Sequence, residues 1–119
     1  MQYLFLLYSD ETQAPEPPKD PKEFQAWIQP WADYTQALKD AGVFVGGDAL
    51  QPTATATTVT NVGSAEPVLT DGPFAETREQ LGGYYLVDCK DLDQALVWAG
   101  KCPIVHYGKC EVRPVQTFS

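Results

Sequence analysis

Three carboxylates and one arginine crowd the nine residues from Asp71 to Glu79, and a pair of glycines follows at 82 and 83. If Glu76 and Glu79 lie on one helical turn, their side chains share a face. Two such carboxylates can bind a cation, accept hydrogen bonds from a ligand or hold a proton between them. Paired glycines at a strand entrance let a ligand or another backbone approach closely. The alternative is an exposed acidic turn with the arginine as a local partner.

The other chemistry-bearing residues are scattered. His106 is the only histidine, in a loop between Pro103 and Gly108. It is either a packed or solvated loop residue, or a lone acid or base that faces the acidic segment. Cys102 lies four residues before His106, which is weak evidence for an activated thiol. The sequence has no nucleophile triad, phosphate loop, dinucleotide fingerprint or zinc spacing.

Composition narrows the classes of function. The 119 residues fit a single domain, 1–119, with 44% hydrophobic and 20% charged residues. A net charge of −8 with eight basic residues argues against direct binding of nucleic acid. The short apolar run after the start predicts neither a membrane span nor a signal peptide. Three cysteines without a CxxC pair indicate reduced thiols in a cytoplasmic protein.

Apolar patterning predicts four core strands and two helices. The strands are expected at 2–8, 43–50, 83–89 and 109–115, and a peripheral hairpin at 53–62 and 66–70. The second helix is opened by Asp91 with Gln94 and stopped by Pro103. Its inner positions are expected to be Leu92, Ala95, Leu96 and Ala99.

The first helix is expected to begin after the cap residue Asp20, with Pro21 at its first position. One apolar stripe follows at spacings of three and four: Phe24, Trp27, Trp31, Tyr34, Leu38 and Ala41. Gly42 should end the helix in a left-handed conformation. Pro30 lies inside it, which predicts a kink or a break near residues 26–29.

Without the hairpin, the order is strand, helix, strand, strand, helix, strand, which is the split βαβ pattern of α+β ferredoxin-like domains. Two helices cover only one face of a four-stranded sheet. The strands at 2–8 and 83–89 are apolar on both faces. The face without helices therefore also needs a partner that excludes water. We therefore predict a homodimer that packs sheet against sheet.

The acidic segment also carries a resemblance. The run DGPF-x-E-x-x-E-x-x-G-G-Y at 71–84, together with Trp98-Ala99, Pro103, Gly108 and the stretch 111–115, resembles the DGPF-motif branch of the YCII-related family. The likeness extends almost from end to end and includes the strand at 3–8. It implies a ferredoxin-like fold that assembles as a dimeric α/β barrel.

The resemblance implies little about chemistry. Relatives in the other branch have a His on the first helix and an Asp before a Pro after the second, proposed as an acid–base pair. Those positions fall on Trp31 and Cys102, and neither side chain can replace the original. Any chemistry would then fall to the carboxylates.

The first hypothesis is a small-molecule site, in a protein that is either a binder or an enzyme of undetermined reaction. Its cleft is expected between helices and sheet, lined by aromatic residues, Tyr85 among them, and the acids. The ligand-binding candidates are Asp71, Phe74, Glu76, Glu79, Tyr84, Trp31 and His106, with no metal and no cofactor required.

Two other classes of function stay open. Proteins with this motif are often encoded beside, or fused to, extracytoplasmic-function sigma factors, so the resemblance implies an accessory protein whose acidic surface contacts such a partner. The third hypothesis is a non-catalytic structural dimer, in which the motif only shapes the fold.

Overall fold

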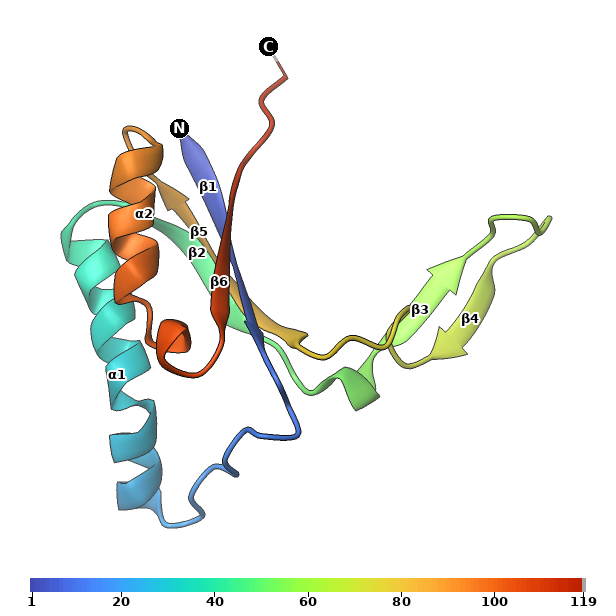
Figure 1. The fold of residues 1–119 in the computed structure, drawn as a ribbon, viewed down its shortest axis with the longest axis horizontal. Coiled ribbons are helices and arrows are strands. Elements are labelled where there is room, and N and C mark those ends of the chain that lie inside the picture. Colours follow the sequence, from blue (N-terminus) through green and yellow to red (C-terminus); the bar gives the residue numbers. More distant parts are fainter. Residues whose placement is uncertain (119) are drawn as a thin grey trace.

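The computed structural model describes residues 1–118, which form a four-stranded antiparallel sheet, two helices on one of its faces and a separate hairpin (Figure 1). The elements are β1 (Gln2–Ser9), α1 (Pro21–Asp40), β2 (Phe44–Ala49), β3 (Thr57–Thr60), β4 (Val68–Asp71), β5 (Gln80–Asp88), α2 (Leu92–Lys101) and β6 (Lys109–Pro114). Short 3-10 helices η1 (Thr53–Thr55) and η2 (Pro103–His106) join them. The sheet order β2-β5-β1-β6 confirms the predicted α+β, ferredoxin-like arrangement.

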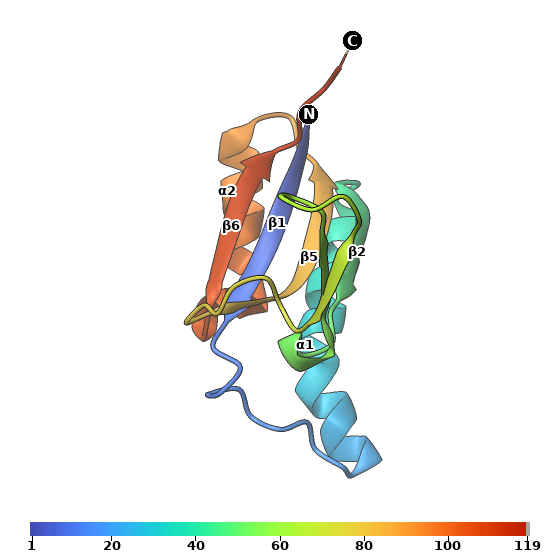
Figure 2. The ribbon, with the colours of Figure 1, turned by 90° about the vertical axis from the view of Figure 1, so that its right-hand side faces the viewer.

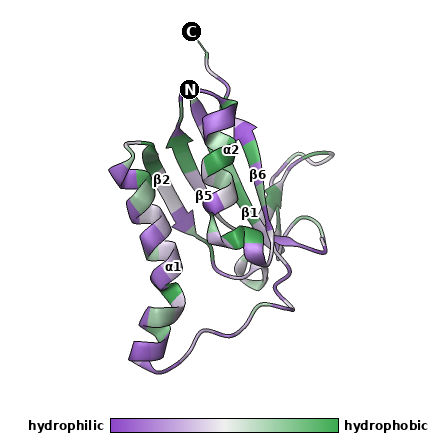
Figure 3. Ribbon diagram, turned by 60° about the vertical axis from the view of Figure 1, so that its left-hand side comes forward, coloured by the Kyte–Doolittle hydropathy of each residue, from purple (hydrophilic) through white to green (hydrophobic). Residues whose placement is uncertain are grey.

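The core lies between the sheet and the two helices, on what we call the closed face. Alternate residues of β1 point into it, and Phe5 is 0% exposed. Tyr34 and Leu38 of α1 and Ala95 of α2 cover these strands. Both helices carry hydrophobic and hydrophilic residues in alternation along their length, as expected for helices with one buried side (Figure 3).

Helix α1 has the predicted ends. The Asp20 side chain accepts a hydrogen bond from the Lys22 N–H (3.0 Å), and Gly42 has φ +72°. The N–H of Val43 donates to the Leu38 carbonyl (3.1 Å), which completes a Schellman-type end. Of the predicted kink or break, the break does not occur, because one helix runs through Pro30. A proline removes a single backbone bond, and here the turns on both sides of it persist.

The apolar stripe of α1 is only half covered. Tyr34 and Leu38 are buried, whereas Phe24 and Trp27 are exposed and stack on each other, with ring centroids 5.9 Å apart. The first turns of α1 extend past the end of the sheet (Figure 1). In α2 the prediction for Leu92 and Leu96 was also wrong, since both are exposed. The spacing of 3.6 residues per turn aims Ala95 and Ala99 at the sheet.

The opposite, open face of the sheet has no helix. Leu4, Leu6 and Tyr8 of β1 alternate with the buried residues and are half-buried. Leu4 pairs with Leu86, and Leu6 with Tyr84, so both residues of β5 lie on this face as well. Figure 2 shows the sheet from this side, with the helices behind it. An apolar surface of this kind, without cover, is unusual for an isolated domain.

The hairpin of β3 and β4 stands away from the sheet, on the side opposite the helices (Figures 1 and 2). The hairpin was predicted, but its first strand begins later than expected. Residues 53–55 form η1 instead, and β3 begins at Thr57. The Cα radius of gyration is 16.7 Å, against about 13–14 Å for a compact chain of this length. The projecting hairpin accounts for this extended shape.

Strand β5 begins at Gln80, three residues before the predicted start, because the glycines at 82 and 83 are inside the strand. Leu7 pairs with Gly83 and Tyr8 with Leu81, so Gly82 is an unpaired extra residue, a β-bulge. A side chain at Gly83 would meet the Asp48 carbonyl at 2.9 Å, which explains the glycine there. The bulge bends the strand just where the acidic segment enters it.

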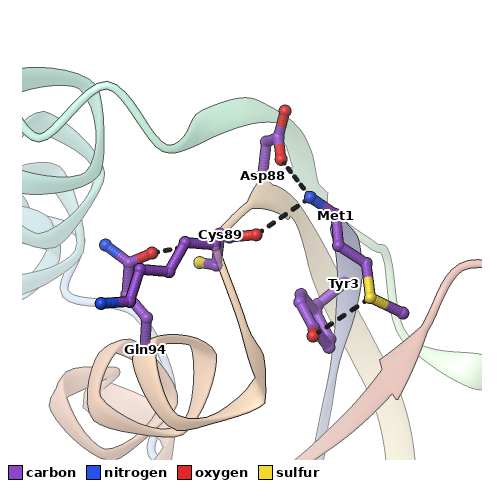
Figure 4. Close-up of polar contacts among 6 residues, drawn as sticks. Met1, Tyr3, Asp88, Cys89 and Gln94 are labelled. Atoms are coloured by element: carbon purple, nitrogen blue, oxygen red, sulfur yellow. Dashed lines mark hydrogen bonds and ion pairs between the residues drawn. The ribbon is translucent and has the colours of Figure 1, made fainter.

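Polar contacts join the far end of β5 to the starts of β1 and α2 (Figure 4). The amino group of Met1 donates to Asp88 Oδ1 (2.9 Å) and to the Cys89 carbonyl (3.0 Å). Asp91 accepts from the Gln94 N–H (2.9 Å), as predicted for this cap, and Gln94 Oε1 accepts from the Lys90 N–H (2.7 Å). In residues 1–118, no helix is both long and apolar enough to cross a membrane.

Candidate functional site

The acidic segment encloses a groove at the end of the sheet where β1 stops and β5 starts. We call residues 72–79 the motif loop, and the hollow beside it the motif groove. Its volume is about 540 Å³. It is lined by Tyr8, Thr53, Pro73, Phe74, Ala75, Glu76, Thr77, Glu79, Gln80 and Leu81. The motif loop therefore supplies most of the wall, and β1, η1 and β5 supply the rest.

The motif loop is irregular, with several bends and no helix. Gly72 has φ +95° and its N–H donates to the Ala56 carbonyl (2.6 Å), which turns the chain out of β4. No helical turn forms between 72 and 79, so the condition under which Glu76 and Glu79 would share a helical face is not met. A proline directly after the turn and the early start of β5 leave too few residues for a helix. Glu76 is exposed, whereas Glu79 is half-buried.

Side-chain hydrogen bonds fix the floor of the motif groove. Glu11 accepts from the N–H and hydroxyl of Thr53 (3.0 and 2.8 Å), which holds η1 against the loop after β1. The Glu11 N–H donates to Gln80 Oε1 (3.0 Å). The Gln80 amide donates to the Thr77 carbonyl, and the Thr77 hydroxyl donates to the Glu79 carbonyl (2.6 Å). One network thus positions the loop on the sheet.

Glu79 is the most constrained carboxylate of the segment. Its Oε1 forms an ion pair with Lys109 Nζ at the start of β6. Its Oε2 is shielded from solvent, and among residues 1–118 it has no hydrogen-bond partner. A buried acceptor without a partner costs about 1–3 kcal/mol, so such atoms call for a specific explanation.

A second hollow lies on the other side of Glu79. Its volume is about 480 Å³, and it is lined by Tyr8, Arg78, Glu79, Lys109, Cys110 and Glu111. Tyr8 pairs with Lys109 and belongs to the open face, so this hollow opens toward that face. Tyr8 and Glu79 border both hollows. Glu79 therefore lies between the motif groove, which offers apolar contact, and the second hollow, which is lined mainly by charged residues.

The expected single cleft does not form. Tyr84 and Tyr85 are successive residues of β5 and point to opposite faces. The Tyr84 hydroxyl donates to Asp48 Oδ2 (2.9 Å), a bond that raises the Tyr84 pKa. Trp31 stacks on Tyr85 with centroids 6.5 Å apart, within the closed layer. Phe74, a ligand-binding candidate, lines the motif groove and is 89% exposed. The structure brings Phe74, Glu76 and Glu79 together, but not Trp31 and Tyr84.

The remaining candidates lie elsewhere. Asp71 ends β4 opposite Thr57 and is exposed. His106 ends η2 and is exposed, outside the residues that line either hollow. Cys102 is fully buried, and burial raises its pKa to about 11, the reverse of an activated thiol. The three cysteines are free, as predicted.

Seven residues that line the two hollows lie outside the motif loop and were not among the candidates from the sequence: Tyr8, Thr53, Gln80, Leu81, Lys109, Cys110 and Glu111. Lys109 is 30 residues from its partner Glu79, so no local pattern links them. The signal that would have found it is the strand order, since β1 pairs with both β5 and β6. Tyr8 has Leu81 on one side and Lys109 on the other. Within residues 1–118, no three His, Cys, Asp or Glu side chains gather as a metal site.

Two comparisons with known proteins bear on this geometry. The family model described as the YCII-related domain matches residues 1–119. An uncharacterised protein of Rhizobium meliloti (strain 1021) is 36% identical over 120 residues, which is 99% of this chain and 94% of that protein. Both comparisons cover the motif groove and the whole sheet.

Proposed function

The chain belongs to the family of YCII-related domains, and on that premise we propose that it is a homodimer that binds a small molecule in the motif groove. The observation that carries the proposal is Glu79 Oε2, a shielded carboxylate oxygen without a partner at the edge of the groove. Protein surfaces rarely keep such an atom unless a ligand or another chain supplies the donor. The DGPF-motif branch of the family is consistent with this site.

The lining of the groove defines the class of ligand. Tyr8, Phe74 and Leu81 offer aromatic and aliphatic contact, and Glu79 Oε2 accepts one hydrogen bond. A ligand with an apolar body and an amine or hydroxyl group matches both features. An ammonium group gains more than a hydroxyl because a charge-assisted hydrogen bond to a carboxylate is stronger.

No reaction is assigned to this site. Trp31 lies in the closed layer, and Cys102 is buried with a raised pKa, so the positions of the relatives' acid–base pair hold no acid or base. Asp71 and His106 are exposed away from the groove. Glu79 is the carboxylate best placed to act on a bound molecule, and its role is to orient the molecule by a hydrogen bond.

The homodimer follows from the open face. Leu4, Leu6 and Leu86 form an apolar strip with no cover in the single chain. Packing this face on its two-fold copy removes the strip from water, and such isologous contacts are the commonest way to form a dimer. Tyr8 belongs to this face and also lines both hollows, so a partner sheet would border the ligand site.

A ligand screen with two matched variants tests the site. Thermal unfolding is followed with aryl-alkyl amines, the corresponding alcohols and the corresponding methyl ethers. Amines are expected to raise the midpoint of wild type and of Glu76→Gln, whose side chain is exposed, but not of Glu79→Gln. The ethers, which lack a donor, should shift none of them. If Glu79→Gln responds as wild type does, Oε2 is not the ligand acceptor.

A regulatory role is the second candidate. The net charge of −8 suits a basic protein partner such as a sigma factor, which the family resemblance suggested. Co-purification of the chain with a sigma factor encoded beside it, retained at moderate salt, would favour this role. The third candidate is a structural dimer, for which both variants would lower stability without affecting any ligand. Three free thiols fit a cytoplasmic location in each case.

A further inference from the structure

We propose that the β3–β4 hairpin is an arm that docks on a second copy of this chain, through the side of the hairpin that carries Val59 and Leu69. The inference rests on the proposed homodimer and adds a second contact to its sheet-to-sheet interface.

The arm has no core within its own chain. Every residue of β4 is exposed, and of β3 only Thr58 is half-buried. A two-stranded hairpin alone is marginally stable in water, so an arm without further contacts would not hold one conformation. Two hydrogen bonds close the base of the hairpin: the Thr58 hydroxyl donates to the Gly72 carbonyl (2.8 Å), and the Gly72 N–H donates to the Ala56 carbonyl. The preceding η1 is held to the body by the bonds from Thr53 to Glu11. The base of the hairpin is therefore fixed, while the side chains of its two strands are uncovered.

The two sides of the arm differ in chemistry. Val59 pairs with Leu69, so both side chains lie on one side, where they are 60% and 69% exposed. Thr57 and Asp71, at the base of the hairpin, lie on the same side. The other side carries Thr58, Thr60, Thr70 and Val68. A cross-strand pair of large aliphatic residues open to water is the kind of patch that a protein interface covers. The Val59–Leu69 side is therefore the docking side.

A second copy is the occupant that the geometry favours. The arm extends into the space in front of the open face, on the side away from the helices (Figures 1 and 2). A sheet-to-sheet partner fills that same space, so each arm must run along its partner. Two-fold symmetry makes the contact reciprocal.

Charge excludes two other occupants. Between Thr57 and Asp71 the only charged residues are Glu66 and Asp71 itself, and both are acidic. The arm therefore has no lysine or arginine with which to hold a nucleic acid or an anionic membrane.

The test is the dimer dissociation constant of the full chain, measured by sedimentation equilibrium from 0.1 to 100 µM. Wild type is expected to be a dimer over most of this range. Val59→Lys/Leu69→Lys should raise the dissociation constant by at least about tenfold, because two apolar side chains lose their burial. The neutral variant Val59→Thr/Leu69→Thr, which keeps strand propensity, should raise it by a smaller factor. Far-UV circular dichroism should stay unchanged, since the altered residues are exposed in the single chain.

The matched control is Thr60→Lys/Val68→Lys, which adds the same charge at the neighbouring rung of the hairpin, on its other side. It is expected to change the dissociation constant by less than about threefold. An equal loss in the control, or no loss in Val59→Lys/Leu69→Lys, would overturn the docking of this side. A monomeric wild type would instead remove the proposed homodimer itself. Loss of the amine response in Glu79→Gln concerns only the ligand site, so the three outcomes are distinguishable.

Discussion

The closed and open faces of the sheet are built from the same strands but have opposite surroundings. Phe5 and Leu7 of β1 are buried under the helices. Leu4 and Leu6, which alternate with them, point to the opposite face and are half-buried. A strand that is apolar on both faces must be covered on both. The chain supplies one cover itself, and in the proposed homodimer a second copy supplies the other. On that proposal, the closed face stabilises the fold and the open face stabilises the dimer.

The largest expected effect on stability distinguishes the two faces through the variants Phe5→Ala and Leu6→Ala. Phe5→Ala removes a fully buried ring and is expected to lower the free energy of unfolding by about 3–5 kcal/mol. That loss should be the same at every protein concentration. Leu6→Ala should cost less in the monomer and more as the concentration rises, because its burial depends on the partner. Urea unfolding at two concentrations measures both, and a concentration-independent loss for Leu6→Ala would contradict the proposed interface.

A smaller effect is expected from the tyrosine hydroxyls of the two faces. On the closed side, the Tyr34 hydroxyl donates to the Trp98 carbonyl (2.8 Å) and so ties α1 to α2. Tyr34→Phe leaves that carbonyl without its partner and should lower the free energy of unfolding by about 1 kcal/mol. Tyr84→Phe should cost less, because water can replace the hydroxyl at the exposed Asp48. Equal losses in urea unfolding would show that Tyr84 is also shielded in solution.

The smallest expected effect concerns the thiols and appears only at high pH. Burial raises the pKa of Cys102 to about 11 and that of Cys110 to about 12, and both lie on the helix side of the sheet. A thiol whose pKa is raised on folding contributes its full stability below its unfolded pKa of about 8.5. The contribution declines as pH rises toward 11–12, because the unfolded chain ionises first. Unfolding midpoints between pH 8 and 11 should fall less steeply for Cys102→Ala than for wild type, and identical slopes would contradict this.

Most of the body could be predicted from the sequence because its signals are local. The capping residues Asp20 and Asp91, the left-handed Gly42 and the two-sided apolar strands each determine their own surroundings. Pro30 misled the prediction of a break, since the loss of one backbone bond did not outweigh the turns that flank it. The exposure of the first half of the α1 stripe could not be predicted either. It depends on where the sheet under the helix ends, and the helix sequence does not determine that.

The site was harder to predict because its geometry is set by distant pairing. The motif indicated which segment matters, and Phe74, Glu76 and Glu79 do share a groove. Their partners come from other strands: Lys109 from β6, Tyr8 from β1 and Thr53 from η1. A helical turn that would place the two glutamates on one face was considered, but the chain there is an irregular, bent loop. Trp31 was assigned to the same cleft although a core layer separates it from Tyr84.

The bulge at Gly82 shifts the phase of the strand. Before it, Leu81 lies on the same face as Tyr84, although three positions separate them and strict alternation would place them on opposite faces. Inward and outward positions must therefore be counted separately on the two sides of this glycine. A count that ignores the extra residue assigns Gln80 and Leu81 to the wrong face.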